Sequence, residues 1–189
     1  MDYKKDFPML NKGIIYFDNS ATTLKPKSVI EEVSNYYSNY SANAHRGDYN
    51  ISQIVDDKLN DVREKTRKFI NAEKKEEIVF TSGATESLNV VIKGFLKNYL
   101  NSKDEILTTK AEHASLILPL FDVVGKTGSV IKYIPLNDDL TVSLENVKKM
   151  ITNKTKVIVI SHVTNVIGDI RPVEEICKYA HKLGILVIV

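Results

Sequence analysis

Residues 156–189 read KVIVISHVTNVIGDIRPVEEICKYAHKLGILVIV, and this pattern predicts a strand, a helix and a second strand. The apolar runs Lys156–Ile160 and Ile185–Val189 are the two strands, each apolar on both faces as in a buried parallel sheet. Pro172 and Gly184 mark the start and the end of the helix between them. Its apolar face consists of Val173, Ile176, Cys177, Ala180 and Leu183.

The same alternation extends over the rest of the chain. Apolar residues recur at helical spacing in residues 29–40, 59–70 and 88–99. Together the pattern predicts an α/β fold with an open, mostly parallel sheet wrapped by helices. No repeat or Pro/Gly-rich linker interrupts it, so we expect an N-terminal segment, residues 1–14, and one domain, residues 15–189. The further predicted strands are Ile14–Phe17, Glu77–Thr81, Glu105–Thr108 and Val130–Ile134.

Composition narrows the class of protein. With 43% hydrophobic and 26% charged residues the chain has the balance of a folded domain, not of a disordered one. Its 26 basic and 24 acidic residues leave a net charge of +2, which gives no reason to expect a nucleic-acid partner. No apolar run reaches the ~18 residues of a membrane span, and the start lacks the apolar core of a signal peptide. We therefore expect a cytoplasmic protein with no membrane partner.

The turn Phe80–Ser87 joins a predicted strand to a predicted helix. Gly83 and Ala84 are small enough for backbone N–H groups to approach an anion, and Ser82 and Thr85 add hydroxyl donors. The turn therefore predicts a phosphate site, although Ser and Thr at a helix start serve equally well as plain helix caps. The sequence Gly125–Thr127 resembles the end of a nucleotide-binding Walker loop but lacks that loop's first glycine.

The histidines and the cysteine give no metal site and no nucleophile. None of His45, His113, His162 and His181 is spaced from another at three or four residues, so we predict no metal. His113 follows a predicted strand end, where its ring is placed to cover a ligand. Cys177 is the single cysteine; it excludes an internal disulfide and, on an apolar helix face, is predicted to be a core residue.

Five motifs occur in the order found in class-V aminotransferase-like cysteine desulfurases, and the chain resembles that family from Ile15 onward. Asn43–Gly47, with its His-Arg-Gly, is similar to the SufS-type branch, whereas the Gly-Ala-Thr of the phosphate turn is closer to the other, NifS-like branch. The motifs are Asp18–Thr23, Asn43–Gly47, Thr81–Ser87, Glu112–Ser115 and Ser161–Gly168.

The resemblance implies the large domain of a fold-type-I pyridoxal-phosphate transferase, truncated, with pyridoxal 5′-phosphate as cofactor. Ala84 and Thr85 would hold the cofactor phosphate. His113 would stack on the pyridine ring and assist proton transfer as the catalytic residue, and Asn165 would bind the 3′ oxygen. The residues implied near the substrate entrance are Asn19, Ala21, His45 and Arg46.

For the whole enzyme, the resemblance implies conversion of L-cysteine to L-alanine and an enzyme persulfide, which a sulfur-acceptor protein takes for iron–sulfur cluster assembly. It also implies a homodimer. The family's pyridine-nitrogen Asp, Schiff-base Lys and nucleophilic Cys have no counterpart in these residues, so we expect an N-terminal, catalytically incomplete portion. The alternatives are a related class-V enzyme (a selenocysteine lyase, epimerase or aminotransferase) and a non-catalytic α/β scaffold fragment.

Overall fold

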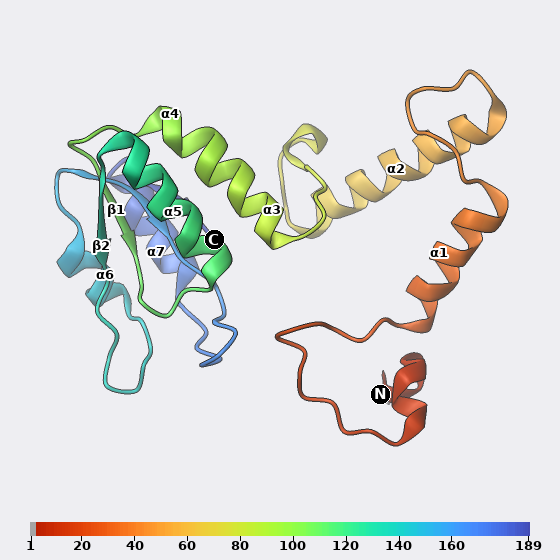
Figure 1. Ribbon diagram of the computed structural model, residues 1–189, viewed down its shortest axis with the longest axis horizontal. Coiled ribbons are helices and arrows are strands. Elements are labelled where there is room, and N and C mark those ends of the chain that lie inside the picture. Colours follow the sequence, from red (N-terminus) through yellow and green to blue (C-terminus); the bar gives the residue numbers. More distant parts are fainter. Residues whose placement is uncertain (1–2) are drawn as a thin grey trace. The chain divides into compact units, whose positions relative to one another are not determined.

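The computed structural model describes residues 3–189, so the first two residues of the predicted N-terminal segment lie outside the described part of the chain. The chain divides into two compact units, one ending at Phe80 and the other comprising Thr81–Val189 (Figure 1). The second unit contains the sheet, and it holds the predicted catalytic and cofactor-binding residues, Ala84, Thr85, His113 and Asn165.

Four strands form one parallel sheet in the order β2-β1-β3-β4. They are β1 (Glu105–Thr108), β2 (Val130–Tyr133), β3 (Thr155–Val159) and β4 (Leu186–Ile188). Ile106 lies opposite Ile131 of β2 and Val157 of β3, and Val159 lies opposite Ile188 of β4. The four corresponding predicted strands and the predicted parallel sheet are confirmed.

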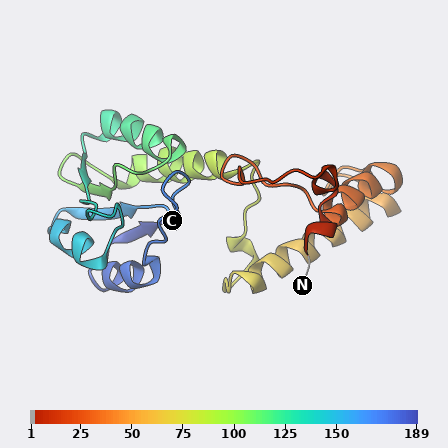
Figure 2. The same ribbon diagram turned by 90° about the horizontal axis from the view of Figure 1, so that it is seen from below.

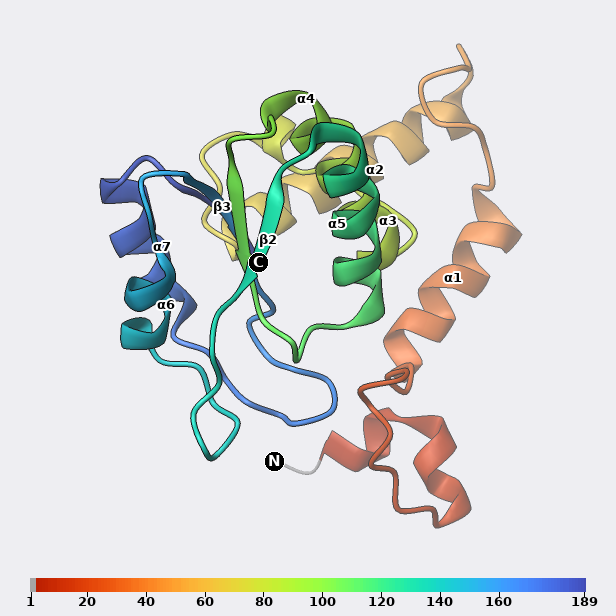
Figure 3. The same ribbon diagram turned by 60° about the vertical axis from the view of Figure 1, so that its left-hand side comes forward.

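Alternate residues of each strand face two separate layers of helices. One layer contains α3 (Ala84–Asn89), a π-helical stretch η4 (Val90–Leu96), α4 (Lys97–Tyr99) and α5 (Ala114–Thr127). The other contains α6 (Leu144–Met150) and α7 (Val173–Lys182). Figures 2 and 3 show the sheet between these layers. The second unit is therefore a three-layer α/β/α domain.

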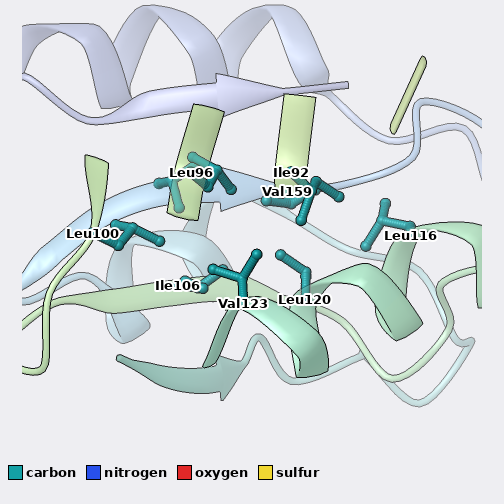
Figure 4. Packing of buried hydrophobic residues seen from close by; sticks show 9 residues of the cluster. Ile92, Leu96, Leu100, Ile106, Leu116, Leu120, Val123 and Val159 are labelled. Atoms are coloured by element: carbon teal, nitrogen blue, oxygen red, sulfur yellow. The ribbon is translucent and has the colours of Figure 1, made fainter. Parts of the chain in front are cut away.

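Each face of the sheet has its own apolar core. On the first face Ile106 and Val159 contact buried side chains of the η4 stretch and α5 (Figure 4). On the second, Leu107 and Ile158 pack against α6 and α7. The period of two along each strand therefore divides its side chains between the two cores. The fully buried members of the first core include Ile92, Leu96, Ile106, Leu120, Val157 and Val159.

The two central strands, β1 and β3, lead to opposite faces of the sheet. β1 is followed by α5 in the first layer, and β3 is followed by α7 in the second. Because parallel strands end at the same edge, the loops after β1 and β3 begin side by side there (Figure 3). A position where neighbouring connections diverge in this way is where open α/β sheets bind their ligands.

The helices α5 and α6 were not predicted from the apolar pattern of the sequence. In α5 the buried residues Leu116, Leu120 and Val123 have helical spacing, but Pro119 stands within the helix and interrupts the sequence pattern. The short helix α6 is capped by Ser143, whose hydroxyl accepts the N–H of Asn146 at 3.2 Å. This cap, rather than a long apolar stripe, marks its start.

The first unit is helical. It contains the short 3₁₀ helices η1 (Tyr3–Asp6), η2 (Pro8–Lys12) and η3 (Lys75–Glu77), and the long helices α1 (Lys27–Asn39) and α2 (Asn50–Phe69). The predicted helical stripes of residues 29–40 and 59–70 are thus confirmed as helices. Many of their apolar side chains are nevertheless exposed, including Val33 at 52% and Phe69 at 90%.

Two predicted strands are wrong. Neither Ile14–Phe17 nor Glu77–Thr81 forms a strand, because neither run pairs with a neighbouring strand among the described residues. A strand requires such a partner for its backbone groups. Phe17 is 91% exposed, and the carbonyl of Ile78 instead accepts a hydrogen bond from the Arg63 guanidinium at 2.5 Å. A run of β-branched or aromatic residues was therefore not sufficient to predict a strand.

Among residues 3–189 no helix has both the length and the apolar character needed to cross a bilayer. The longest of them, α2, reads NISQIVDDKLNDVREKTRKF, with charged residues along most of its length.

Candidate functional site

A pocket of about 380 Å³ lies at the sheet edge where the loops after β1 and β3 begin. It contains His113 from the first loop and Asn165 from the second. The structure thus brings together two predicted site residues that are distant in the sequence, at the position where the strand connections diverge. The lining residues are Lys110, Ala111, Glu112, His113, Ala114, Asn165, Val166 and Ile167.

The imidazole of His113 is held in one orientation by the helix that it begins. His113 is the N-cap of α5, and its Nδ1 accepts the N–H of Ser115 at 3.1 Å. The Ser115 hydroxyl lies 2.7 Å from the same nitrogen. Because Nδ1 is an acceptor, the neutral ring carries its proton on Nε2. His113 can therefore offer a ligand its ring face and one N–H donor.

The loop that carries Asn165 is closed by its own hydrogen bonds. Thr164 is buried, and its backbone N–H donates to the carbonyl of Asp169 at 3.1 Å. The N–H of Gly168 donates to the carbonyl of Thr164 at 3.0 Å, with Gly168 at a φ of +78°, which favours glycine. Asn165 lies at the exposed end of this compact loop, with its side chain amide available to a ligand.

Ala84 and Thr85 lie at the start of α3, which packs against α5, but they do not line the pocket of His113 and Asn165. The cap residue Gly83 contributes no side chain, and the first N–H groups of a helix have no acceptor within the helix. These N–H groups and the exposed Thr85 hydroxyl are donors suited to an anion.

The predicted Ser82 donor has a partner within the turn. Glu86 Oε2 accepts the Ser82 N–H at 2.7 Å and the Ser82 hydroxyl at 2.6 Å. These two bonds, the hydroxyl's first, lower the pKa of Glu86. Ser82 is therefore already engaged with Glu86, whereas the cap residue of α3 is Gly83, which forms no side-chain cap bond.

The four predicted substrate-entrance residues belong to the first unit. Asn19 lines a pocket of about 320 Å³ with Tyr16 and Leu24, and the backbone of Ala21 closes a turn onto Asp18 at 3.2 Å.

His45 and Arg46 lie in the loop before α2. His45 has a φ of 61°, and both its backbone N–H, at 2.8 Å, and its Nδ1, at 3.1 Å, contact the Asp56 carboxylate. Arg46 is exposed to solvent.

Cys177 is half-buried in α7, where burial raises the pKa of its thiol. A thiol that stays protonated is a poor nucleophile. Cys177 is nevertheless only half-buried and is not among the buried residues of either core, so its prediction as a core residue is wrong. Within residues 3–189 no cluster of three or more potential metal ligands occurs.

Comparison with known families gives one match over most of the chain. Residues 15–189 match the profile of the family described as aminotransferase class-V. The chain belongs to this family. Its predicted fold, that of the fold-type-I large domain, is confirmed by the solved structures that it resembles.

The class-V chain is 40% identical to a probable cysteine desulfurase of Halalkalibacterium halodurans, over 100% of this chain and 48% of that protein. It resembles the apo structure of a cysteine desulfurase from Thermococcus onnurineus NA1, with a TM-score of 0.91, 40% identity, and 98% of this chain and 46% of that one covered. It also resembles the structure of SspA in complex with cysteine, with a TM-score of 0.82 and 28% identity. That match covers 92% of this chain and 49% of the other. The chain spans about half the length of the curated relatives that it matches.

Two pocket residues were missed as site residues by the sequence analysis. Lys110 was not singled out from the sequence, yet it lines the pocket. Glu112 appeared only as part of a motif, although it lies directly before His113. Their position immediately after a buried strand was the available signal, because ligand sites in α/β sheets lie at strand ends.

Proposed function

We propose that this class-V chain binds pyridoxal 5′-phosphate as part of a cysteine desulfurase, which converts L-cysteine to L-alanine and an enzyme persulfide. The observation that carries the proposal is the pocket shared by His113 and Asn165 at the diverging loops of β1 and β3. The names of the relatives support the reaction and the substrate. Residues 15–189 would act together as one cofactor-binding domain.

The donor set fits the cofactor's three chemical parts. A phosphate dianion suits the free N–H groups at the start of α3 and the Thr85 hydroxyl. An aromatic ring suits the imidazole face of His113, and a phenolate oxygen suits the Asn165 amide. Lys110, on the same pocket, adds positive charge for an anionic ligand. The carboxylate of Glu86 would repel an anion at the helix start. Its charge is, however, partly offset by the two hydrogen bonds that it accepts from Ser82.

Each residue then has a definite task. Thr85 and Ala84 anchor the phosphate, Asn165 orients the ring through its oxygen, and His113 covers the ring. Because Nδ1 of His113 is occupied by Ser115, proton transfer would use Nε2. When bound, the cofactor supplies an electron sink for the carbon skeleton of an amino acid.

The remaining parts of the proposal concern the whole enzyme. Asn19, Ala21, His45 and Arg46 would lie near the substrate entrance. The enzyme would be a cytoplasmic homodimer that passes sulfur to an acceptor protein for iron–sulfur cluster assembly. These statements are drawn from the family resemblance and the relatives' names.

Cofactor binding can be tested on residues 1–189 by titration with pyridoxal phosphate and with pyridoxal, which lacks the phosphate. We expect Thr85→Ala to weaken binding of the phosphate form by about 10- to 100-fold, the loss of one hydrogen bond to a charged group. Binding of pyridoxal should be unchanged. Asn98→Ala, at the far end of the continuous α3–α4 helix, is the matched control. Absence of saturable pyridoxal phosphate binding would contradict the proposal.

The reaction needs a separate test. Where the gene encodes residues beyond Val189, the longer product should form alanine from L-cysteine together with an enzyme persulfide, and an added thiol reductant, itself oxidised to its disulfide, should release that sulfur as sulfide. Release of selenide only, or transamination or epimerisation without sulfide, would instead identify one of the related class-V activities.

A further inference from the structure

A buried ion pair connects the two loops that form the pocket. The guanidinium of Arg171 bonds through Nη1 to the Glu112 carboxylate, and both side chains are fully buried. Glu112 directly precedes His113 in the loop after β1. Arg171 ends the loop after β3 that carries Asn165, and its own N–H donates to the carbonyl of His162 at 2.9 Å.

Further hydrogen bonds extend this network. The second oxygen of Glu112 accepts the Ser161 N–H at 3.0 Å and the Ser161 hydroxyl at 2.5 Å. Thr109 donates its hydroxyl to the first oxygen at 2.7 Å and accepts Nη2 of Arg171 at 3.0 Å. Asp169 Oδ2 lies 3.6 Å from Nε of Arg171. Every contact joins the loop after β1 to the loop after β3, or closes one of them.

Such a network is a poor way to gain stability alone. Removing two charges from water costs about as much as their attraction returns, and apolar residues of similar volume often serve as well. What the planar guanidinium of Arg171 adds is direction, because it bonds in a narrow range of orientations, here through Nη1 to the Glu112 carboxylate and through Nη2 to the Thr109 hydroxyl. Here that direction determines how one loop lies against the other.

We propose that the Glu112–Arg171 pair is a positioning device that sets the separation and orientation of His113 and Asn165 across their shared pocket. Neither Arg171 nor its partner Thr109 lines the pocket, so they act on a ligand only through the two loops. For the identity of the ligand this inference rests on the proposed function. The proposed phosphate donors at the start of α3 are not members of this network, so we expect it to leave phosphate binding unchanged.

The test compares Arg171→Met and Arg171→Lys with the unsubstituted chain of residues 1–189. Lysine keeps the charge but cannot bond to Glu112 and Thr109 with one planar fork. Val147→Ala is the matched control, because Val147 is fully buried in α6 and belongs to the other core. It destabilises the fold without touching the two loops.

The first measurement is ligand affinity. For both Arg171 variants we expect pyridoxal phosphate to bind about 10- to 100-fold more weakly, as for a site displaced by about 1 Å. Binding of inorganic phosphate, which reports the α3 contacts, should be unchanged. Val147→Ala should leave both affinities unchanged. Equal pyridoxal phosphate affinity in Arg171→Met and Val147→Ala would overturn the inference.

The second measurement needs no ligand and separates the two proposals. Amide hydrogen exchange should accelerate at Ser161, Gly168 and Ser115 in Arg171→Met while the β1 amides keep their protection. If the unsubstituted chain binds no pyridoxal phosphate but these amides respond together, the proposed function fails and the positioning role stands. If exchange rises uniformly, or not at all in the loops, the positioning role fails whatever the ligand result.

Discussion

Ser161 donates both its backbone N–H, at 3.0 Å, and its hydroxyl, at 2.5 Å, to one oxygen of the Glu112 carboxylate. The two residues follow neighbouring strands, β3 and β1, at the same edge of the sheet. This contact joins the loop of His113 to the loop of Asn165. The site is therefore formed by bonds between loops that are separated in the sequence by two helices, α5 and α6, and two strands, β2 and β3.

His113 has two roles, as the N-cap of α5 and as the proposed stacking partner of the cofactor ring, and substitutions can separate them. His113→Ala removes the cap of α5 and should lower the free energy of unfolding by about 1 kcal/mol. His113→Asn keeps a good N-cap and should retain stability, yet it lacks the imidazole. Urea unfolding measures the cap, and pyridoxal phosphate titration measures the ligand role. Both variants should bind the cofactor more weakly; normal binding by His113→Asn would exclude ring stacking.

Gly83 tests the phosphate cradle. A Cβ at Gly83 would meet no atom within 4 Å, so Gly83→Ala should fold normally. The added methyl group would instead stand where an anion approaches the start of α3. We expect weaker binding of pyridoxal phosphate and unchanged binding of pyridoxal.

Gly94→Ala, in the same continuous helix and equally open, is the control for Gly83 and should gain about 0.5–1 kcal/mol without affecting either ligand. Equal cofactor affinity in the two glycine variants would argue against a phosphate site at this turn.

Glu105 should make the stability of the second unit depend on acid pH. This buried carboxylate at the start of β1 bonds to Lys132 at 2.8 Å and to the Thr152 hydroxyl at 2.6 Å. These bonds, that to Lys132 first, lower the pKa of Glu105.

A depressed pKa in the folded state means that this contribution is present above the unfolded pKa of about 4.3 and is lost as the pH falls through the folded value. Urea unfolding between neutral pH and about pH 3 measures it. Glu105→Gln should be less stable at neutral pH by about 1–3 kcal/mol, with a smaller further loss in acid. An acid profile identical to that of the unsubstituted chain would contradict this role.

The first core should respond to truncation as a close-packed interior does. Leu120 is fully buried between α5 and the sheet, with 0% of its surface exposed to solvent. Leu120→Ala should cost about 2–5 kcal/mol in urea unfolding. Val166→Ala, at a side chain that is 87% exposed, should change stability by less than about 0.5 kcal/mol. Similar values for the two variants would mean that this core is loosely packed.

The thiol of Cys177 should react slowly. Burial raises its pKa, so little thiolate is present at neutral pH. We expect slow alkylation in the native chain and rapid alkylation in urea, followed by mass spectrometry. Fast native alkylation would show that α7 opens readily.

The sequence by itself determined the strands of the sheet and two of the helical segments around it, residues 88–99 and α7, because apolar periodicity is a local property of the chain. Val157 and Ile158 on β3, and Ile176 and Ala180 on α7, are buried as their spacing predicted. The same reasoning failed at Phe17 and Val79, where an apolar run has no strand to pair with, and at α5, where Pro119 interrupts the pattern.

Only the tertiary structure decided which polar residues meet. His113 and Asn165 were individually recognisable from their motifs, but their shared pocket depends on the strand order β2-β1-β3-β4, which sequence spacing does not specify. The pairing of Glu112 with Arg171 likewise had no local signal, since two charges at a distance along the chain become partners only when folding removes both from water. The physical reason is that periodicity selects the elements, whereas the packing of those elements brings the loops, and therefore the site, together.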